Sequence, residues 1–191
     1  MFENVREDIR QGVDWHALPA LRRVAGRRAE CASVIALSPE LQVVLIYRLQ
    51  AWCRGRGIPI VPNILRRVTM LLAGVSIGDR VNIGPGLLLN HGHVVIDGET
   101  SIGPECSIAP FVTIGLNTGG PDVSFDGPII GQFVFIGTGA KILGRVFIGH
   151  NARIGANAVV LDDVPDDSTA VGVPARVIPH ESRFGPAARN T

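Results

Sequence analysis

The chain has 191 residues and a formal net charge of +1, so its charge gives no reason to expect nucleic acid binding. Hydrophobic residues make up 46% of the chain but aromatic residues only 5%, and there are 23 glycines. These values argue against a core of aromatic side chains. They suit a narrow aliphatic interior and a chain with many tight turns. The length allows one domain, or one domain with an appendage.

The first part of the chain predicts helices. Short helices are expected at residues 4–11 and 18–32. A clearer helix starts at Ser38, where a capping hydroxyl is followed by proline and then by an acidic residue. Apolar residues keep helical spacing from there to Trp52, and Gly55 is expected to end the helix.

A further helix is expected at residues 64–72. Asn63 is placed to cap its start, and Gly74 is placed to end it. Residues 1–74 are therefore predicted to form a short N-terminal helical domain.

From residue 75 onward, a hydrophobic residue returns every six positions, usually followed by glycine. These residues are Ile77, Ile83, Leu89, Val95, Ile102, Ile108, Ile114, Ile130, Ile136, Ile142, Ile148, Ile154 and Val160. A small or branched residue lies two places before most of them. A period of six fits neither a helix nor a simple strand, and it is the signature of a parallel β-helix. The chain is thus predicted to be mainly β, with the hexapeptide-repeat β-helix at residues 75–178.

The repeat is interrupted twice. One extra residue falls between Val95 and Ile102, and a longer break at 116–129 contains Asp122 and Asp126. Long loops on a rigid scaffold tend to carry function, although a tolerated surface insertion is the alternative. Residues 179–191 are expected to form a flexible tail.

The cysteines and the termini suggest an intracellular protein. Cys31, Cys53 and Cys106 are odd in number and far apart, so neither a disulfide framework nor a zinc site is expected. Cys106 occupies an inward repeat position and is predicted to be a small core residue. No signal peptide or long apolar span is visible, which makes the cytoplasm the expected location.

Two histidines flank a glycine near the start of the repeat. His91 lies two residues after Leu89, at a turn where side chains point outward. Histidine can accept a proton near neutral pH, so a catalytic base and an ordinary turn residue are both open at this point. His93 lies two residues before Val95, an inward position that favours a structural role.

Three motifs together resemble a known family. They are the segment 90–100 with its His-Gly turn, the run 136–144, and the Gly-Val-Pro-Ala-Arg ending at 172–176. In this order they resemble the serine acetyltransferase branch of the hexapeptide-repeat acyltransferases, over residues 40–178. The resemblance implies a left-handed parallel β-helix, and homotrimers or pairs of trimers. It also implies direct transfer of an acetyl group from acetyl-CoA to a hydroxyl, with the acetyl-CoA bound between neighbouring β-helices of the trimer.

The resemblance also implies site residues. His91 falls on the family's general base, and Asn90 and Glu99 complete the expected catalytic set. The expected CoA contacts are Gly115, Asn117, Thr138 and Ala156. No metal is expected.

The chain departs from the family at positions that matter for the acceptor. Asn90 stands where serine acetyltransferases carry an aspartate. Asp126 and Gly127 stand where the family has the Arg-His pair that binds the serine carboxylate, and an aspartate there repels a carboxylate. Asp122 and Asp126 are therefore expected to contact a different acceptor, as in the colanic acid type of exopolysaccharide O-acetyltransferase.

The main hypothesis is thus O-acetylation of a sugar or a small metabolite. The alternative is serine O-acetyltransferase of cysteine biosynthesis, with the serine carboxylate held by Arg145 or Arg153. A zinc hydratase on a similar β-helix needs a His-x4-His pair, whereas His91 and His93 are two apart. A purely structural β-helix is the remaining alternative, and it requires neither the long loop nor the acyltransferase ending.

Overall fold

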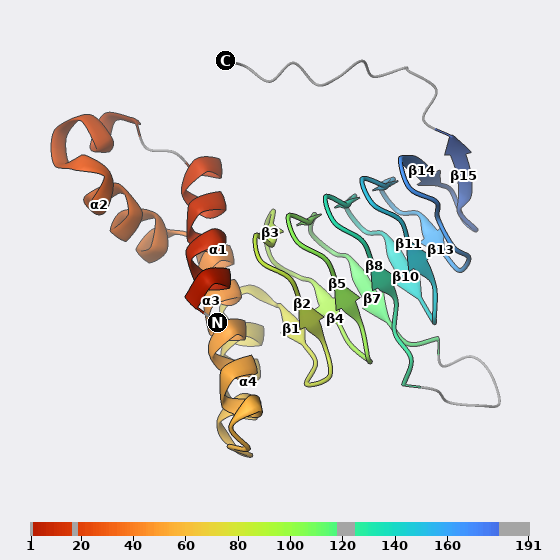
Figure 1. Cartoon of the computed structure of the whole chain (residues 1–191), viewed down its shortest axis with the longest axis horizontal. Coiled ribbons are helices and arrows are strands. Elements are labelled where there is room, and N and C mark those ends of the chain that lie inside the picture. The colour runs from red at the N-terminus through yellow and green to blue at the C-terminus, as the bar shows by residue number, and fades with distance from the viewer. Residues whose placement is uncertain (1, 17–18, 118–124, 180–191) are drawn as a thin grey trace.

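The computed structural model describes residues 2–16, 19–117 and 125–179. Helices lie at one end of a stack of short strands, and the chain proceeds along the stack away from them (Figure 1). The helices are α1 (Phe2–Trp15), α2 (Pro19–Leu37), α3 (Pro39–Gly55) and α4 (Val61–Ala73).

The predicted helix at 38–55 is confirmed by α3, which begins after Ser38 and ends at Gly55. The predicted capping hydroxyl is wrong, because Ser38 makes no side-chain cap hydrogen bond. Proline in the first turn, with φ already suited to a helix, is what marks this start. The helices before it, α1 and α2, are longer than predicted, and Gly26 kinks α2 with φ of 80°.

The last helix, α4, starts three residues earlier than the sequence predicted. It begins at Val61, with proline in its first turn, and Asn63 lies inside the helix instead of capping it. Its end at Gly74 is as predicted, since that glycine adopts the left-handed conformation with φ of 65°. The β strands begin two residues later.

The strands are very short and belong to three sheets. In chain order they are β1 (Ser76–Ile77), β2 (Asn82–Ile83), β3 (Leu88–Leu89), β4 (Val95–Ile96), β5 (Ser101–Ile102), β6 (Ser107–Ile108), β7 (Thr113–Gly115), β8 (Ile129–Ile130), β9 (Phe135–Ile136), β10 (Lys141–Leu143), β11 (Phe147–Ile148), β12 (Arg153–Ile154), β13 (Val159–Val160), β14 (Ser168–Val171) and β15 (Arg176–Pro179).

The order of strands shows how the chain winds. The first sheet is β1-β4-β7-β10-β13, the second is β2-β5-β8-β11, and the third is β3-β6-β9-β12-β14-β15. From β1 to β10 each strand pairs in parallel with the strand three further along the chain. At the end of the stack, β12 pairs in parallel with β14, and β15 pairs antiparallel with β14. The chain therefore crosses all three sheets in each coil. We call this stack the prism.

The hexad residues line the interior of the prism in three columns. In the first sheet, Ile77 pairs with Ile96, Ile96 with Ile114, and Ile114 with Ile142. Isoleucines at inward positions are 0–3% exposed throughout the prism. The smaller residues two places earlier are buried as well, and burial raises the pKa of the Cys106 thiol to about 11. The inward pattern predicted from the sequence is thus confirmed at all but one position.

That position is Val95, where the predicted register is wrong. Val95 is 40% exposed, whereas Ile96 is fully buried in register with Ile77 and Ile114. The extra residue of this coil therefore lies before Ile96, in the turn that holds both histidines. A slip of one residue moves a side chain to the opposite face of a strand, so the inward position predicted for His93 is also wrong, and its side chain is exposed.

Two edges of the prism matter for the site. We call the turns that join the third sheet to the first the histidine edge; they comprise residues 90–94, 109–112, 137–140 and 155–158. We call the turns that join the first sheet to the second the loop edge; their described residues are 78–81, 97–100, 116–117, 125–128, 144–146 and 161–164. The first sheet separates the two edges.

Helix α3 is fixed to the first coil by buried polar side chains. The Tyr47 hydroxyl donates to the Val81 carbonyl at 3.0 Å and accepts from the Ile83 amide at 3.1 Å. The Arg48 guanidinium donates to the Ile83 carbonyl at 2.5 Å and to the Asp8 carboxylate at 2.7 Å. Because removing one partner of a buried ion pair leaves a costly unpaired charge, this network sets the position of α3 on the prism.

The long loop and the tail are only partly described. Asp122 lies outside the described residues, which skip 118–124, and β8 begins at Ile129 where the loop was expected to end. The predicted tail at 179–191 lies outside them as well, apart from Pro179. The division into domains at residue 74 stays a prediction.

The helices of the described chain are too short or too polar to span a membrane singly. The segments Arg28–Leu37 and Pro39–Gly55 pass by length and composition only when taken together, and they are bent by 89°.

Candidate active site

The turn that carries His91 is pressed against the end of α4. His91 has a left-handed backbone with φ of 97°, a conformation that residues other than glycine rarely adopt. The His93 amide donates to the Ala73 carbonyl at 2.8 Å. A Cβ at Gly92 would lie 1.9 Å from the same carbonyl oxygen, so only glycine fits between the histidines. Strained turns of this kind persist where surrounding structure holds them, and they gather at functional sites.

The His91 imidazole points outward and faces a glutamate on α3. Its side chain is 81% exposed, and its Nδ1 lies 3.5 Å from Oε1 of Glu40, whose side chain is only 18% exposed. Both residues line a cavity of about 480 Å³ between the histidine edge and the helices. The rest of its wall is Pro39, Met70, Leu71, Leu72, Ala73, Gly74, Gly92 and His93. The arrangement turns Nδ1 toward the helices, while the structure gives Nε2 no partner among the described residues.

Asn90 is bonded to the next coil. Its Nδ2 donates to the Ser107 hydroxyl at 3.0 Å, and its buried Oδ1 has no hydrogen-bond partner in the described part of the chain. The structure therefore places Asn90 next to His91 in sequence without bonding the two side chains to each other.

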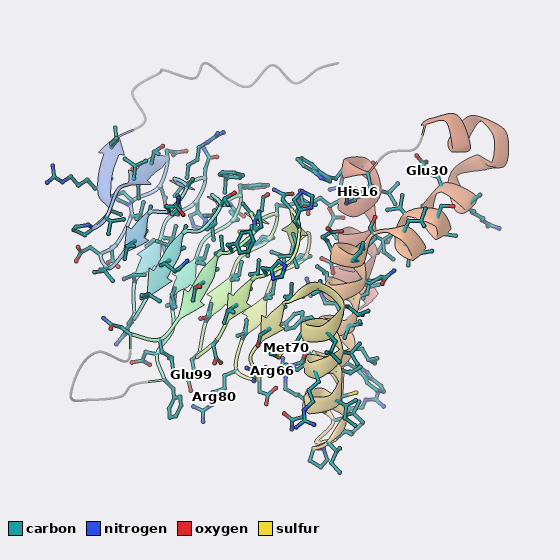
Figure 2. The ribbon with its side chains drawn as sticks, turned by 180° about the vertical axis from the view of Figure 1, so that it is seen from behind. His16, Glu30, Arg66, Met70, Arg80 and Glu99 are labelled. Carbon is teal, nitrogen blue, oxygen red and sulfur yellow. The ribbon has the colours of Figure 1, made fainter. Side chains whose placement is uncertain are left out.

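Glu99 lies on the loop edge, away from His91. Its carboxylate pairs with the Arg80 guanidinium at 2.8 Å, and the two lie side by side in Figure 2. Arg80 also stacks over the Phe125 ring at 4.6 Å. One chain by itself thus does not bring the two predicted catalytic side chains, His91 and Glu99, together.

The residues predicted to contact CoA divide in the same way. Thr138 and Ala156 are exposed on the histidine edge, farther along it than His91, and the Asn157 amide donates to the Thr138 carbonyl at 2.8 Å. Asn117 lies on the loop edge, and Gly115 is buried at the end of β7, two residues before it.

A second cavity of about 240 Å³ opens on the loop edge. Its wall contains Asn117, Asp126, Leu143, Gly144, Arg145, Val146 and Leu161. Asp126 and Arg145, proposed from the sequence for different acceptors, thus share one cavity. Arg153 lies instead on the third sheet, in register with Phe135.

Gly127 lies close against the coil below the loop. A Cβ at this position would lie 2.4 Å from the Thr100 hydroxyl oxygen and 2.8 Å from the Thr100 amide nitrogen. Glycine is therefore required by the path of the backbone here, so the histidine of the family's Arg-His pair does not fit at this position.

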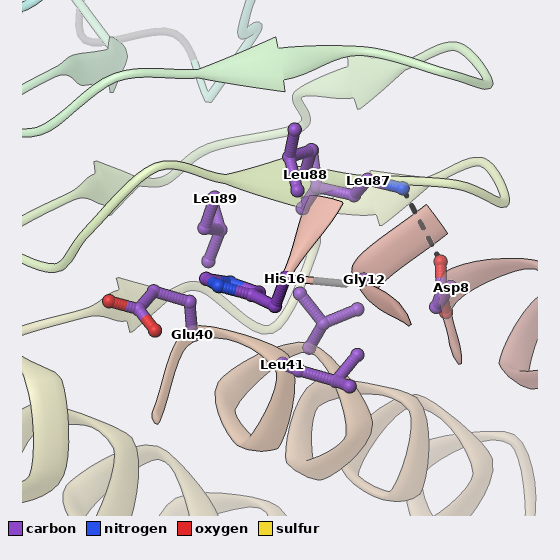
Figure 3. A pocket seen from close by; sticks show the side chains of 9 residues that line it. Asp8, Gly12, His16, Glu40, Leu41, Leu87, Leu88 and Leu89 are labelled. Carbon is purple, nitrogen blue, oxygen red and sulfur yellow. Dashed lines mark hydrogen bonds between the residues drawn. The ribbon is translucent and has the colours of Figure 1, made fainter. Parts of the chain in front are cut away.

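Glu40 is the residue that the sequence analysis missed. It also lines a small cavity of about 10 Å³ together with His16, which follows the end of α1 (Figure 3). The available signal is its place as an acidic residue in the first turn of α3, a feature that by itself indicates only a helix start. No sequence period links α3 to a turn about fifty residues later.

The chain is similar to known bacterial acyltransferases. The family model "Bacterial transferase hexapeptide (six repeats)" matches residues 127–162. A serine acetyltransferase of Helicobacter pylori is 40% identical over 149 residues, which are 76% of this chain and 84% of that protein. A serine acetyltransferase of Synechococcus elongatus is 40% identical over 146 residues, and the match covers 76% of this chain and 59% of that protein.

Solved structures agree with this. The crystal structure of serine acetyltransferase from Brucella abortus superposes with a TM-score of 0.77 at 29% identity, covering 93% of this chain and 68% of that one. A serine acetyltransferase in complex with CoA superposes with a TM-score of 0.74 at 29% identity, covering 92% of this chain and 68% of that one. These relatives favour the serine acetyltransferase alternative over the exopolysaccharide type. The chain belongs to the serine acetyltransferase family of hexapeptide-repeat acyltransferases.

Proposed function

We propose that this protein is a serine O-acetyltransferase that moves the acetyl group of acetyl-CoA to the hydroxyl of serine. The observation that carries the proposal is the 40% identity to the Helicobacter pylori serine acetyltransferase over 84% of that protein's length. The solved serine acetyltransferase in complex with CoA supports acetyl-CoA as the co-substrate.

His91 acts as the general base in this proposal. Its Nε2 takes the proton of the serine hydroxyl while the oxygen attacks the thioester carbonyl. The tetrahedral oxyanion requires hydrogen-bond donors aimed at it. When the carbon–sulfur bond breaks, the imidazolium returns the proton to the CoA thiolate, and O-acetylserine and free CoA leave.

The proposed assembly is a homotrimer of left-handed prisms. The division of the predicted residues supports it, because His91, Thr138 and Ala156 lie on one edge and Glu99 and Asn117 on another. A second copy that sets its loop edge beside the histidine edge of the first unites both groups. Acetyl-CoA then lies in the groove between the two prisms.

A sugar hydroxyl is the second candidate acceptor, and the loop edge is what favours it. Asp126 carries a negative charge where the family binds a carboxylate, and Gly127 leaves no room for a histidine. If serine is the acceptor, Arg145 is the cation on the wall of this cavity that can bind its carboxylate.

Release of the CoA thiol from acetyl-CoA tests the function. The full-length protein is assayed with serine, homoserine, free sugars and nucleotide sugars. Rapid, saturable release with serine is expected, whereas saturable release with a sugar and none with serine would replace the proposed acceptor by the second candidate.

Two arginine variants then locate the carboxylate. Arg145→Gln is expected to raise the KM for serine by roughly 10-fold to 100-fold, the worth of a charged hydrogen bond. Arg153→Gln is the matched control on the third sheet, and it should leave this KM unchanged.

A further inference from the structure

We propose that Glu40 is the positioning residue for His91: its carboxylate accepts a hydrogen bond from Nδ1–H and leaves Nε2 to act as the base. This inference rests on the proposed acyl transfer, in which His91 is the base. The carboxylate partner of the base then comes from helix α3, and not from position 90, which directly precedes His91 in the turn.

The geometry at Nδ1 carries the assignment. Nδ1 of His91 lies 3.5 Å from Oε1 of Glu40. This separation is within range of a charge pair and slightly longer than a good hydrogen bond. Catalytic hydrogen bonds are often long in free enzymes and shorten when substrate binds, and a small rotation of the exposed imidazole closes the gap. With the proton held on Nδ1, the lone pair is on Nε2, which is the arrangement that a general base needs.

Glu40 is well held for this task. It belongs to the first turn of α3, where an acidic side chain interacts favourably with the positive end of the helix dipole. The same helix is fixed to the first coil by Tyr47 and by Arg48, which is 5% exposed and pairs with the buried Asp8. The Glu40 carboxylate and the strained His91 turn are thus held in place by the same contact between α3 and the first coil.

Asn90, the residue that the family resemblance puts in this place, is used elsewhere. Its Nδ2 donates to Ser107 and no described contact joins it to His91. Its amide oxygen brings no net charge to stabilise an imidazolium. The chain therefore has a reason to supply a carboxylate from another element.

Few other titratable groups face this pair. His16 shares the small cavity behind Glu40, and His93 lies beyond Gly92 with its ring stacked on Phe111 at 5.2 Å. Among the described residues, the walls of the two cavities next to Glu40 hold one further carboxylate, Asp8, which is already bonded to Arg48.

A double-mutant cycle tests the assignment. Glu40→Gln keeps the shape and removes the charge, and it is expected to lower kcat roughly 10-fold to 100-fold with little change in the KM for acetyl-CoA, because orientation of a base acts on the chemical step. In the His91→Ala background the same change should cost nothing further. Asp14→Asn, which removes an exposed carboxylate from α1, is the control. An unchanged kcat, or an equal loss in both backgrounds, would overturn the proposal.

A measurement without turnover separates this inference from the proposed function. Nitrogen-15 spectra of the His91 ring in the wild-type trimer should show the proton on Nδ1, and in Glu40→Gln the signal should move toward the Nε2–H form. A wild-type ring protonated on Nε2 contradicts the role of Glu40 even if no acceptor is found. Turnover with serine together with a wild-type-like Glu40→Gln variant removes the inference and leaves the function standing.

Discussion

The histidine edge and the loop edge of the prism are built by the same repeat but differ in what holds them. The histidine edge has short turns, and its first turn is clamped by α3 and α4 through Glu40 and Ala73. The loop edge carries the long insertion and a cavity that contains Asp126 and Arg145. We infer that the histidine edge holds the base rigidly, while the residues of the loop edge select the acceptor. The acceptor can therefore change without moving the base.

The largest effect is expected from removing the His91 imidazole, which tests whether the histidine edge carries the base. His91→Ala is expected to lower kcat by roughly 10²-fold to 10⁴-fold, the usual worth of a general base. The thermal unfolding temperature should stay near that of the wild type, because the side chain is 81% exposed. His150→Ala, an exposed turn histidine off both edges, serves as the control in the CoA-release assay. Retained turnover in His91→Ala would remove this residue as the base.

The next largest effect tests the register of the coil that contains His91. Ile96→Ala is expected to destabilise the protein by about 2–5 kcal/mol, since it empties space in a packed interior. Val95→Ala should stay within about 0.5 kcal/mol, because this side chain lies on the surface. Chemical denaturation of the two variants gives the comparison. If Val95→Ala were the more destabilising variant, the register predicted from the sequence would be correct and His93 would point inward.

A smaller effect is expected where the His91 turn meets α4. Gly92→Ala puts a Cβ 1.9 Å from the Ala73 carbonyl oxygen, so the turn or the helix end must move. We expect a loss of roughly 1–3 kcal/mol, as for other overpacked sites, together with reduced kcat. Gly55→Ala meets nothing within 4 Å and is the matched control. Normal stability and turnover in Gly92→Ala would show that the clamp does not position His91.

Periodic features could be predicted from the sequence and close approaches could not. The isoleucine columns and the ends of α3 follow from local rules that act over a few residues, namely spacing, proline and glycine. The register at Val95 failed because one extra residue leaves two adjacent apolar side chains, Val95 and Ile96, as equal candidates for the interior. The pairing of Ile96 with Ile77 and Ile114 selects between them.

The candidate site divides in the same manner. The His-Gly turn is visible in the sequence because glycine beside a histidine interrupts a regular repeat. Its partner Glu40 is not visible, since its position depends on where Tyr47 and Arg48 fix α3 against the prism.

The sequence by itself determined that this protein is a prism of hexapeptide coils with an exposed histidine in its first complete turn, because a six-residue period buries one side chain per strand wherever it occurs. Only the tertiary structure decided which carboxylate faces that histidine and which residues share a cavity. The contact between Glu40 and His91 joins residues about fifty positions apart, and its distance is set by the packing of a whole helix on a whole coil.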